Sequence, residues 1–360
     1  MFSKLEIVGY RGFEKFSIPK LGRINLLVGR NNCGKTSILE AVQLPLSIGR
    51  LEVMAEIAMR RGETLNSPQS RVSANHFFHG HEIRGDRNIC VSLDEAHIRM
   101  ELDPLEVNRQ RTLFGRDDEA MIPIWGLHCS WNDIDETEYI LPILDDGDID
   151  VRKYIRSHLN ASPKNTEAFP VAFLPTSGLS VRDMTQMFDS IVLTPAEDYV
   201  NLALQTIDPR VRRVASLGKR SSHASDSRGG FVVKLEDVQD RVPIGSLGDG
   251  IWRIFGLAVS MSSLSSGVLL IDEIDTGLHY TTMEKMWRLI DETSKRLNVQ
   301  VFATTHSRDC YESLASICRD DVMEDGSEIM VHRIEQGRET AVTFFEGEII
   351  SASLHDTEVR

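Results

Sequence analysis

The sequence lacks long apolar runs, and no stretch approaches the roughly 20 uninterrupted apolar residues that a membrane-spanning helix needs. Its N-terminus, MFSKLEIVGYRGFEKF, carries Lys4, Glu6 and Arg11 where a secretory signal would be apolar. Cysteine is also scarce. The five cysteines are odd in number and scattered, without the paired spacing of a zinc site or a disulfide framework. These absences predict a cytoplasmic protein with no membrane contact.

Positive charge is in short supply as well. The 40 lysines and arginines are outnumbered by 54 acidic residues, which gives a net charge of -14 at pH 7. Because affinity for phosphates depends on an excess of cations, this balance excludes a protein that coats nucleic acid indiscriminately. A local basic groove stays open, and with it DNA as a partner, because one segment gathers Arg210, Arg212, Arg213, Lys219 and Arg220. The stretch that follows, SSHASDSRGG, predicts a mobile tip.

Apolar periodicity predicts an α/β protein. KLEIVGY and RINLLVG are expected strands, and the second leads into the helix KTSILEAVQL. Between about residues 75 and 145, short runs predict a mostly antiparallel sheet: HFF, NICVSL, HIRMEL, WGLHCSW and YILPIL. The acidic run DDGDID is most simply a solvated turn, with a metal site as the alternative.

The second half of the chain has a helical stretch and then returns to α/β. LSVRDMTQMFDSIVLTPAEDYVNLALQTIDPRVRRVASLG has helical periodicity. GVLLIDE and VQVFATTHS are expected buried strands around the helix MEKMWRLIDETSKRL, and two short strands with a small helix finish the lobe. We therefore divide the chain into an N-terminal lobe (1–175), a helical insertion (176–230) and a C-terminal lobe (231–360).

GRNNCGKT satisfies the phosphate-loop pattern G-x-x-x-x-G-K-[ST], with an apolar strand before it and an apolar helix after it. The glycines let the backbone curl so that its N–H groups face phosphates, Lys35 reaches the β and γ phosphates of ATP, and the Thr36 hydroxyl is offered to Mg²⁺. An ordinary glycine turn is the alternative. The residues expected to hold the nucleotide are Gly29, Arg30, Asn31, Asn32, Cys33, Gly34, Lys35, Thr36 and Ser37.

A phosphate loop needs acidic groups on a neighbouring strand, and GVLLIDE ends on Asp272 and Glu273. Asp272 is the expected Mg²⁺ ligand, and Glu273 would orient or deprotonate the attacking water. Taken alone, two acids after a buried strand are a plain strand terminus. The next strand ends at His306, where a sensor of the γ-phosphate would lie.

In this order, the phosphate loop, SLGDG, LLIDEIDTGLH and ATTHS resemble the ATP-binding-cassette heads of the SMC and RecF group. Within that group they are most similar to the compact ATPases related to the overcoming-lysogenization-defect family. The resemblance covers about the first 45 residues and about residues 242–314. It implies a P-loop NTPase fold with the two lobes of an ABC or SMC head and a helical insertion.

The same resemblance implies a homodimer with ATP at its interface. Ser246 and Gly248 of SLGDG would contact the ATP bound to the second copy, with Leu247 standing where the family commonly has glycine. Asp275 would cross the interface, and Arg11 would touch the nucleotide. The simpler alternatives are a helix N-cap for SLGDG and a surface strand charge for Arg11.

Longer relatives carry a TOPRIM nuclease domain after the ATPase, whereas 54 residues follow His306 here. We therefore expect an ATPase subunit without its own TOPRIM domain, which controls a separate TOPRIM-like nuclease or toxin in defence against phage. Two alternatives are a RecF-like DNA clamp for repair and a nucleotide-sensing scaffold with negligible turnover.

Overall fold

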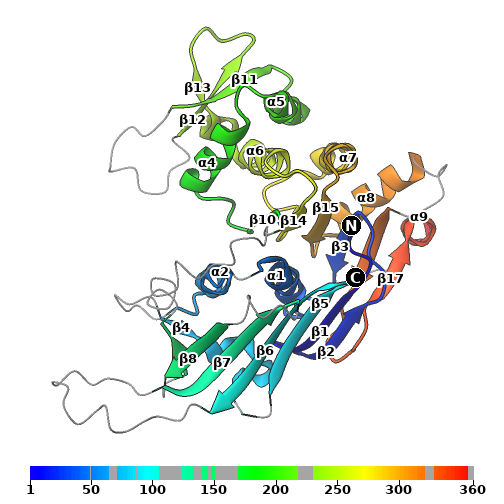
Figure 1. The fold of residues 1–360 in the computed structure, drawn as a ribbon. Helices are drawn as coiled ribbons and strands as arrows, with labels where there is room; N and C mark the ends of the chain where they lie inside the picture. The colour runs from blue at the N-terminus through cyan, green and yellow to red at the C-terminus, as the bar shows by residue number, and fades with distance from the viewer. Residues whose placement is uncertain are drawn as a thin grey trace, which may run out of the picture.

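The computed structural model describes residues 1–48, 50–64, 71–83, 85, 87–104, 123–132, 139–144, 147–150, 169–217, 230–320 and 328–355. Among them, no helix is both long and apolar enough to cross a bilayer. The described residues form two six-stranded sheets, with helices between them and beyond them, and two smaller sheets (Figure 1).

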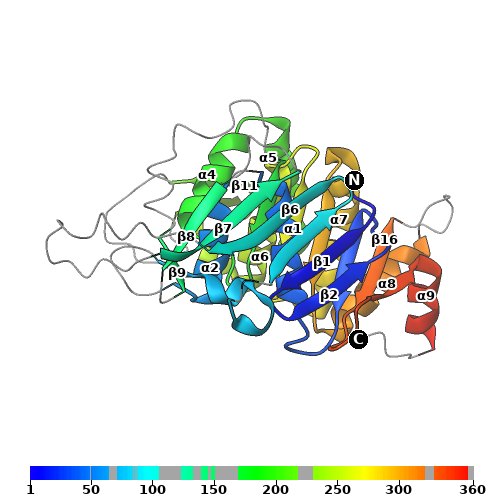
Figure 2. The ribbon, with the colours of Figure 1, turned by 60° about the horizontal axis from the view of Figure 1, so that its bottom comes forward.

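The first sheet is antiparallel and has six strands in the order β2-β1-β5-β6-β7-β8. Buried and exposed side chains alternate along strands such as β1 and β8, because one face packs on the core and the other faces solvent (Figure 2). The strands are β1 (Leu5–Tyr10), β2 (Phe13–Ile18), β5 (Asn88–Leu93), β6 (Ala96–Pro104), β7 (Pro123–Trp131) and β8 (Tyr139–Leu144).

The second sheet is parallel except for its last strand, and its order is β10-β14-β15-β3-β16-β17. Its inner strands are buried on both faces: Leu269 and Ile271 of β14 join one apolar cluster, while Val268 and Leu270 join the other. A continuous apolar run is what such a strand requires. The strands are β10 (Val171–Leu174), β14 (Val268–Ile271), β15 (Gln300–Thr304), β3 (Ile24–Val28), β16 (Ile329–Arg333) and β17 (Val342–Phe345).

Helix α1 (Lys35–Leu46) fills the space between the two sheets, where it contacts β5 and β6 on one side and β15 on the other. Ten of its twelve residues are buried. The indole Nε1 of Trp131 donates to the carbonyl of Leu44 at 3.0 Å and so fastens the helix to the antiparallel sheet. Helix α2 (Glu52–Arg61) lies beside α1. The short elements β4 (Val72–Ser73), η1 (Ala74–Phe77), η2 (His79–His81) and β9 (Asp148–Ile149) complete this half.

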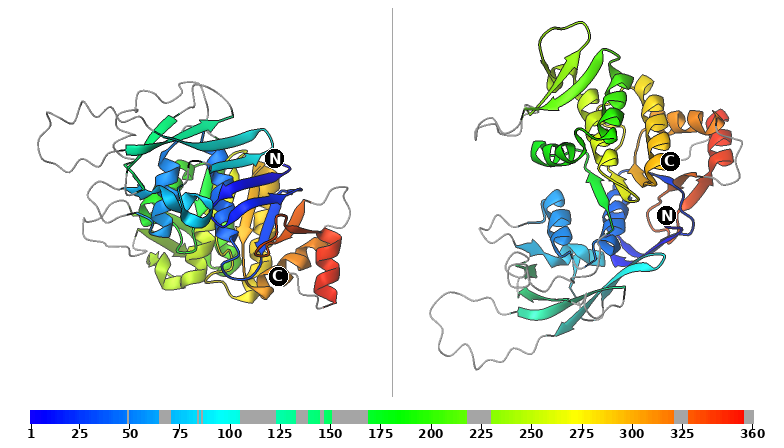
Figure 3. Two further views of the ribbon diagram at one scale, coloured as in Figure 1. Left: turned by 90° about the horizontal axis from the view of Figure 1, so that it is seen from below. Right: turned by 45° about the horizontal axis from the view of Figure 1, so that its top comes forward.

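The opposite face of the second sheet is covered by α6 (Asp249–Ser262), α7 (Tyr280–Leu297), α8 (Arg308–Asp320) and α9 (Glu346–Leu354). Outside α6 stands a further layer, on the side away from α1 (Figure 3). It contains α4 (Val181–Ile191), α5 (Pro195–Ile207) and a small sheet of β11 (Val211–Ser216), β12 (Phe231–Leu235) and β13 (Val242–Pro243).

Most elements expected from periodicity are present, and three expectations fail. The run HFF lies in η1 and the residue after it rather than in a strand. The arginines at 212 and 213 lie on strand β11, because the helical stretch ends at Ile207. Within DDGDID, Asp148 is not solvated: it belongs to β9 and is only 3% exposed, while Asp145 and Asp146 are outside the described residues.

The expected mobile tip also falls almost wholly outside the described residues, as do Lys219 and Arg220. The division into three segments stays a prediction. In space, β3 from the first segment pairs with β15 and β16 from the last, so one sheet is shared between the ends of the chain.

A buried histidine locks β3 to β16. His332 has no exposed surface; its Nε2 lies 3.1 Å from Asn25 Oδ1 and its Nδ1 lies 3.0 Å from the Thr343 hydroxyl. Because an amide oxygen only accepts, Nε2 carries the proton and Nδ1 accepts from the threonine. Burial lowers the pKa of His332 to about 3.

This histidine should make the protein acid-sensitive. His332 becomes protonated near pH 6.5 in the unfolded chain but only near pH 3 in the folded chain. The free energy of unfolding that comes from this difference is fully present above pH 6.5 and is lost as the pH falls toward 3. Between pH 7.5 and pH 5 the loss should be about 2 kcal/mol of unfolding free energy. His332→Gln keeps a donor and an acceptor but cannot titrate, so guanidinium titrations should show a smaller acid loss. An equal loss in both proteins would contradict this prediction.

Candidate functional site

The loop after β3 has the backbone that a phosphate loop needs. Gly29 and Gly34 have φ angles of 147° and 97°, which side chains other than glycine rarely adopt. A Cβ at Gly29 would lie 2.5 Å from the Ile334 carbonyl oxygen, and one at Gly34 would lie 2.5 Å from the Phe13 ring. Both glycines are therefore required by conformation and by space.

The loop leads directly into the N-terminus of α1. Gly34 is the N-cap residue, and no described side chain caps the helix. Its first N–H groups and the positive end of its dipole are thus available to an anion. The Lys35 ammonium donates to the carbonyls of Gly29 and Arg30 at 2.8 and 2.9 Å, so it lies within the loop.

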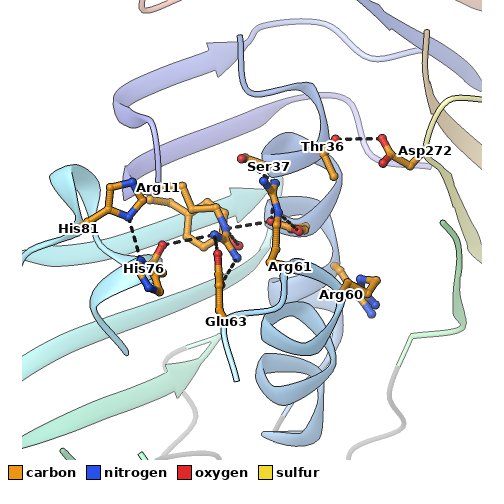
Figure 4. A network of polar contacts seen from close by, with 12 residues as sticks. Arg11, Thr36, Ser37, Arg60, Arg61, Glu63, His76, His81 and Asp272 are labelled. Atoms are coloured by element: carbon orange, nitrogen blue, oxygen red, sulfur yellow. Dashed lines mark hydrogen bonds and ion pairs between the residues drawn. The ribbon is translucent and has the colours of Figure 1, made fainter. Parts of the chain in front are cut away.

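Asp272 is the centre of a small hydroxyl network. Its Oδ1 accepts from Thr36 at 3.0 Å and from Thr304 at 2.8 Å, and its Oδ2 accepts from Thr176 at 3.0 Å (Figure 4 shows the Thr36 contact). A carboxylate beside a phosphate-loop hydroxyl fits Mg²⁺, which is usually held by one or two protein groups together with phosphates and water. Among the described residues there is no group of three or more histidine, cysteine, aspartate or glutamate side chains that could hold a metal ion.

The strand order differs from the expectation of adjacent strands. β14, which leads to Asp272, is not next to β3; β15 lies between them. The contact between Thr36 and Asp272 still forms because the three strands are parallel and end at the same edge.

Glu273 follows with a left-handed backbone, φ 46°. Its N–H donates to the Thr304 hydroxyl at 2.8 Å, and one carboxylate oxygen lies 3.7 Å from His306 Nδ1. Both side chains are partly exposed, at 39% and 52%. The structure thus brings the two residues together at the edge of the sheet, next to Asp272 and open to solvent.

Asp275 is fixed by the same strand end, because the Thr305 hydroxyl donates to its Oδ1 at 2.6 Å. SLGDG lies beside this segment: a Cβ at Gly277 would be 3.6 Å from the Asp249 Cβ. His279, which had no predicted role, is the N-cap residue of α7.

Ser246 is exposed and lies in the short helix η5 (Ile244–Leu247), and within the described residues its hydroxyl makes no hydrogen bond. The N-cap of α6 is instead Gly248, at φ 95°, with no side-chain cap from the described part of the chain. Ser246 therefore does not cap the helix, although SLGDG does supply its N-cap residue, Gly248. The Ser246 side chain and the N-terminus of α6, which has no side-chain cap from the described residues, are both exposed to solvent.

Arg11 is not a surface charge, so the simpler alternative is wrong. It is 5% exposed and pairs with Glu40 at 2.9 Å and with Glu63 at 2.6 Å (Figure 4). Glu40 also binds Arg61, whose Nη2 donates to the Ser37 hydroxyl at 3.1 Å. This network connects the β1–β2 turn to the phosphate-loop helix. Contact of Arg11 with a nucleotide stays a prediction.

A cavity of about 520 Å³ opens beside the loop, lined by Arg11, Asn32, Cys33, Gly34 and Ser37 among others. Arg30 and Asn31 are exposed. Gln43 lines a separate cleft of about 740 Å³ and accepts from Arg60 at 2.5 Å.

The three described arginines of the basic cluster are all paired with acidic residues. Arg210 pairs with Asp208 and Asp237, Arg212 with Glu236, and Arg213 with Glu197. Paired guanidinium groups offer less charge to a phosphate backbone, so this part of the surface gives little support to a nucleic-acid groove.

Sequence reasoning missed several residues that organise the site: Thr176, Thr304 and Arg253, and the pair Glu40 and Arg61. The Thr304 and Thr305 hydroxyls stand in the quoted ATTHS motif, so a strand-end pair of threonines was the available signal. No comparable sequence signal marks Thr176, Arg253, Glu40 or Arg61, since their partners are distant in the chain.

Comparisons with known proteins agree with this geometry. Residues 1–57, which include the phosphate loop, match the family described as "AAA ATPase domain". Residues 152–309, which include Asp272, Glu273 and His306, match "AAA domain, putative AbiEii toxin, Type IV TA system".

Curated proteins and solved structures similar to the chain include the following three. An ATP/GTP phosphatase of Helicobacter pylori is 20% identical over 353 residues, which are 89% of either chain. Uncharacterized protein MJECL10 of Methanocaldococcus jannaschii is 36% identical over 67 residues, 17% of this chain and 31% of that protein. The structure of an SMC head bound to the C-terminal winged-helix domain of ScpA superposes with a TM-score of 0.50 at 15% identity, covering 96% of this chain and 98% of that one.

The shared fold and the matched ATPase domains establish the chain as an ATPase with a P-loop fold of the ABC and SMC-head type.

Proposed function

We propose that two copies of this ATPase dimerise around Mg²⁺–ATP and that the dimer controls a separate nuclease or toxin in bacterial defence against phage. One observation carries the dimer. Ser246 and Gly248 are exposed at an uncapped helix N-terminus, although the phosphate loop, Asp272 and Glu273 already form a site without them. A second anion-binding feature in one chain is accounted for if it serves the nucleotide of the other.

The residues divide the chemistry between them. The α1 N-terminus and Lys35 bind and orient the phosphates, while Thr36 and Asp272 hold Mg²⁺, which supplies charge stabilisation to the transferring phosphoryl group. Glu273 accepts a proton from the attacking water, and His306 beside it holds the far side of the γ-phosphate. Ser246 and Gly248 of the second copy close the site and exclude water.

Support for an effector comes from the relatives. The SMC head of similar fold is bound to a separate protein domain. The family matched by residues 152–309 is described as an AAA domain and a putative toxin of a type IV toxin–antitoxin system, so the description connects such ATPase domains with toxin systems. Purification of tagged protein with ATP from the native host should bring down an effector. ATP-dependent, salt-sensitive binding to DNA ends without an effector would favour the repair clamp instead.

The assigned roles predict different losses for two variants. Lys35→Ala removes a phosphate clamp, so the Kd for ATP should rise about tenfold or more, as expected for the loss of a charge-assisted contact. Glu273→Gln should bind ATP as the wild type does but release phosphate about 10²- to 10⁴-fold more slowly, because only the proton acceptor is lost. Calorimetry and a phosphate-release assay measure the two effects. A Glu273→Gln protein with the native rate would refute the assigned base.

The shared site predicts complementation between two inactive variants. Ser246→Arg should spare ATP binding by the monomer but abolish ATP-driven dimerisation and turnover, because it places a bulky cation where the partner's γ-phosphate must dock. Mixed with Lys35→Ala, it forms heterodimers with one intact and one doubly broken site, so roughly a quarter of the wild-type activity should return for a symmetric interface.

The control is Ser265→Arg, an exposed serine between the far end of α6 and the start of β14. It should leave dimerisation and turnover unchanged. Normal dimerisation of Ser246→Arg on the Glu273→Gln background, measured by light scattering with ATP, would contradict the interfacial role. Mixtures that stay inactive although heterodimers form would show that both sites must act together.

A further inference from the structure

Arg253 is a buried cation whose hydrogen bonds all go to backbone carbonyls around the site. It lies in α6, is 7% exposed, and donates to the carbonyls of Pro175 at 2.7 Å, Asp272 at 2.7 Å and Glu273 at 2.9 Å. These three residues follow the neighbouring strands β10 and β14. A single guanidinium therefore joins two strand ends at the edge where the chemistry occurs.

The strand geometry explains why a donor is needed there. Asp272 N–H donates to the Leu174 carbonyl at 2.9 Å, beyond the last paired residues of β10 and β14, Leu174 and Ile271. Buried carbonyls without a donor cost free energy, and the planar fork of arginine can serve several at once. Arg253 supplies the donors that the next pairs of strand residues would otherwise supply.

Glu273 has a strained backbone that needs such support. A φ of 46° in a residue other than glycine is sparsely populated and persists only when the surroundings hold it. The peptide N–H of Glu273 donates to Thr304, and its carbonyl accepts from Arg253. The direction of the Glu273 side chain follows from this backbone conformation.

The charge of Arg253 also matters at this position. Burial lowers the pKa of its guanidinium, while Asp272, Asp275 and Glu273 raise it, so a buried cation stands behind three carboxylates. A methionine at this position would have neither the N–H donors for the carbonyls nor the charge that faces the acidic cluster.

We infer that Arg253 is a positioning residue for hydrolysis: it holds the Glu273 peptide so that the carboxylate lies where it can accept a proton from water. The inference rests on the role proposed for Glu273. The helix that carries Arg253 has Gly248 as its N-cap residue and directly follows the short helix η5 that carries Ser246.

The test measures the ATP Kd and kcat of Arg253→Met. Because a displacement of about 1 Å can cost about 10²-fold in rate, kcat should fall by about 10- to 100-fold while the Kd stays within about threefold. Arg253→Lys should recover part of the rate, since an ammonium can serve at least one of the carbonyls. An unchanged kcat in Arg253→Met, or a Kd that rises as much as kcat falls, would overturn the inference.

A double-mutant cycle separates positioning from a general loss of stability. If Arg253 acts through Glu273, the substitution Glu273→Gln should lower kcat much less in the Arg253→Met protein than it does in the wild type. If the fold-loss in kcat of the double variant equals the product of the two single fold-losses, Arg253 has a merely structural role. If Arg253→Met does not fold, the same cycle with Arg253→Lys decides between these outcomes.

The matched control is Arg23→Met, at the other end of the same sheet. Arg23 is largely buried, pairs with Glu328 and donates to the Ser294 carbonyl at 3.3 Å. Its loss should lower the midpoint of thermal unfolding but leave kcat unchanged. If Glu273→Gln alone leaves kcat at the wild-type value, the base proposed for hydrolysis is wrong. Failure of that proposal can therefore be told apart from failure of the inference about Arg253.

Discussion

The position of β15 between β14 and β3 is the constraint on which the nucleotide site depends. Parallel strands end at one edge, so Thr304 at the end of β15 meets Asp272 there, on the same carboxylate oxygen that Thr36 of the phosphate-loop helix contacts. Its hydroxyl donates to Asp272 and accepts from the Glu273 N–H. One side chain thus holds the Asp272 carboxylate and the Glu273 peptide together, and Thr305 donates to Asp275 in the same way.

Helix α6 connects the inner and outer parts of the machinery. Its N-terminus is exposed and uncapped, and one turn later Arg253 is buried against the strand ends. The threonine contacts of Asp272 and the arginine contacts of Glu273 come from different elements, so the acids are held from both sides of the sheet.

The phosphate loop and the buried strands could be predicted from the sequence, because their signals are local. The phosphate loop is eight consecutive residues with fixed glycine positions, and an apolar run such as VLLI identifies a buried strand wherever it occurs. Local signals fail where the environment decides. HFF has strand-forming residues but forms a tight helical turn. The arginines that lie on β11 pair with acidic residues that come from other segments of the chain. Arg11 could be named as a candidate, yet its burial against Glu40 and Glu63 depends on contacts across 29 and 52 positions of the chain.

By itself, the sequence determined the class of fold and singled out Lys35, Thr36, Asp272 and Glu273 as the candidate site residues, because they stand in motifs whose spacing is typical of phosphate and metal chemistry. Only the tertiary structure decided the strand order, the threonine bridge and the place of Arg253. Those features join residues that are distant along the chain, and hydrogen bonding between them is governed by which strand ends meet at the edge of the sheet rather than by any local pattern.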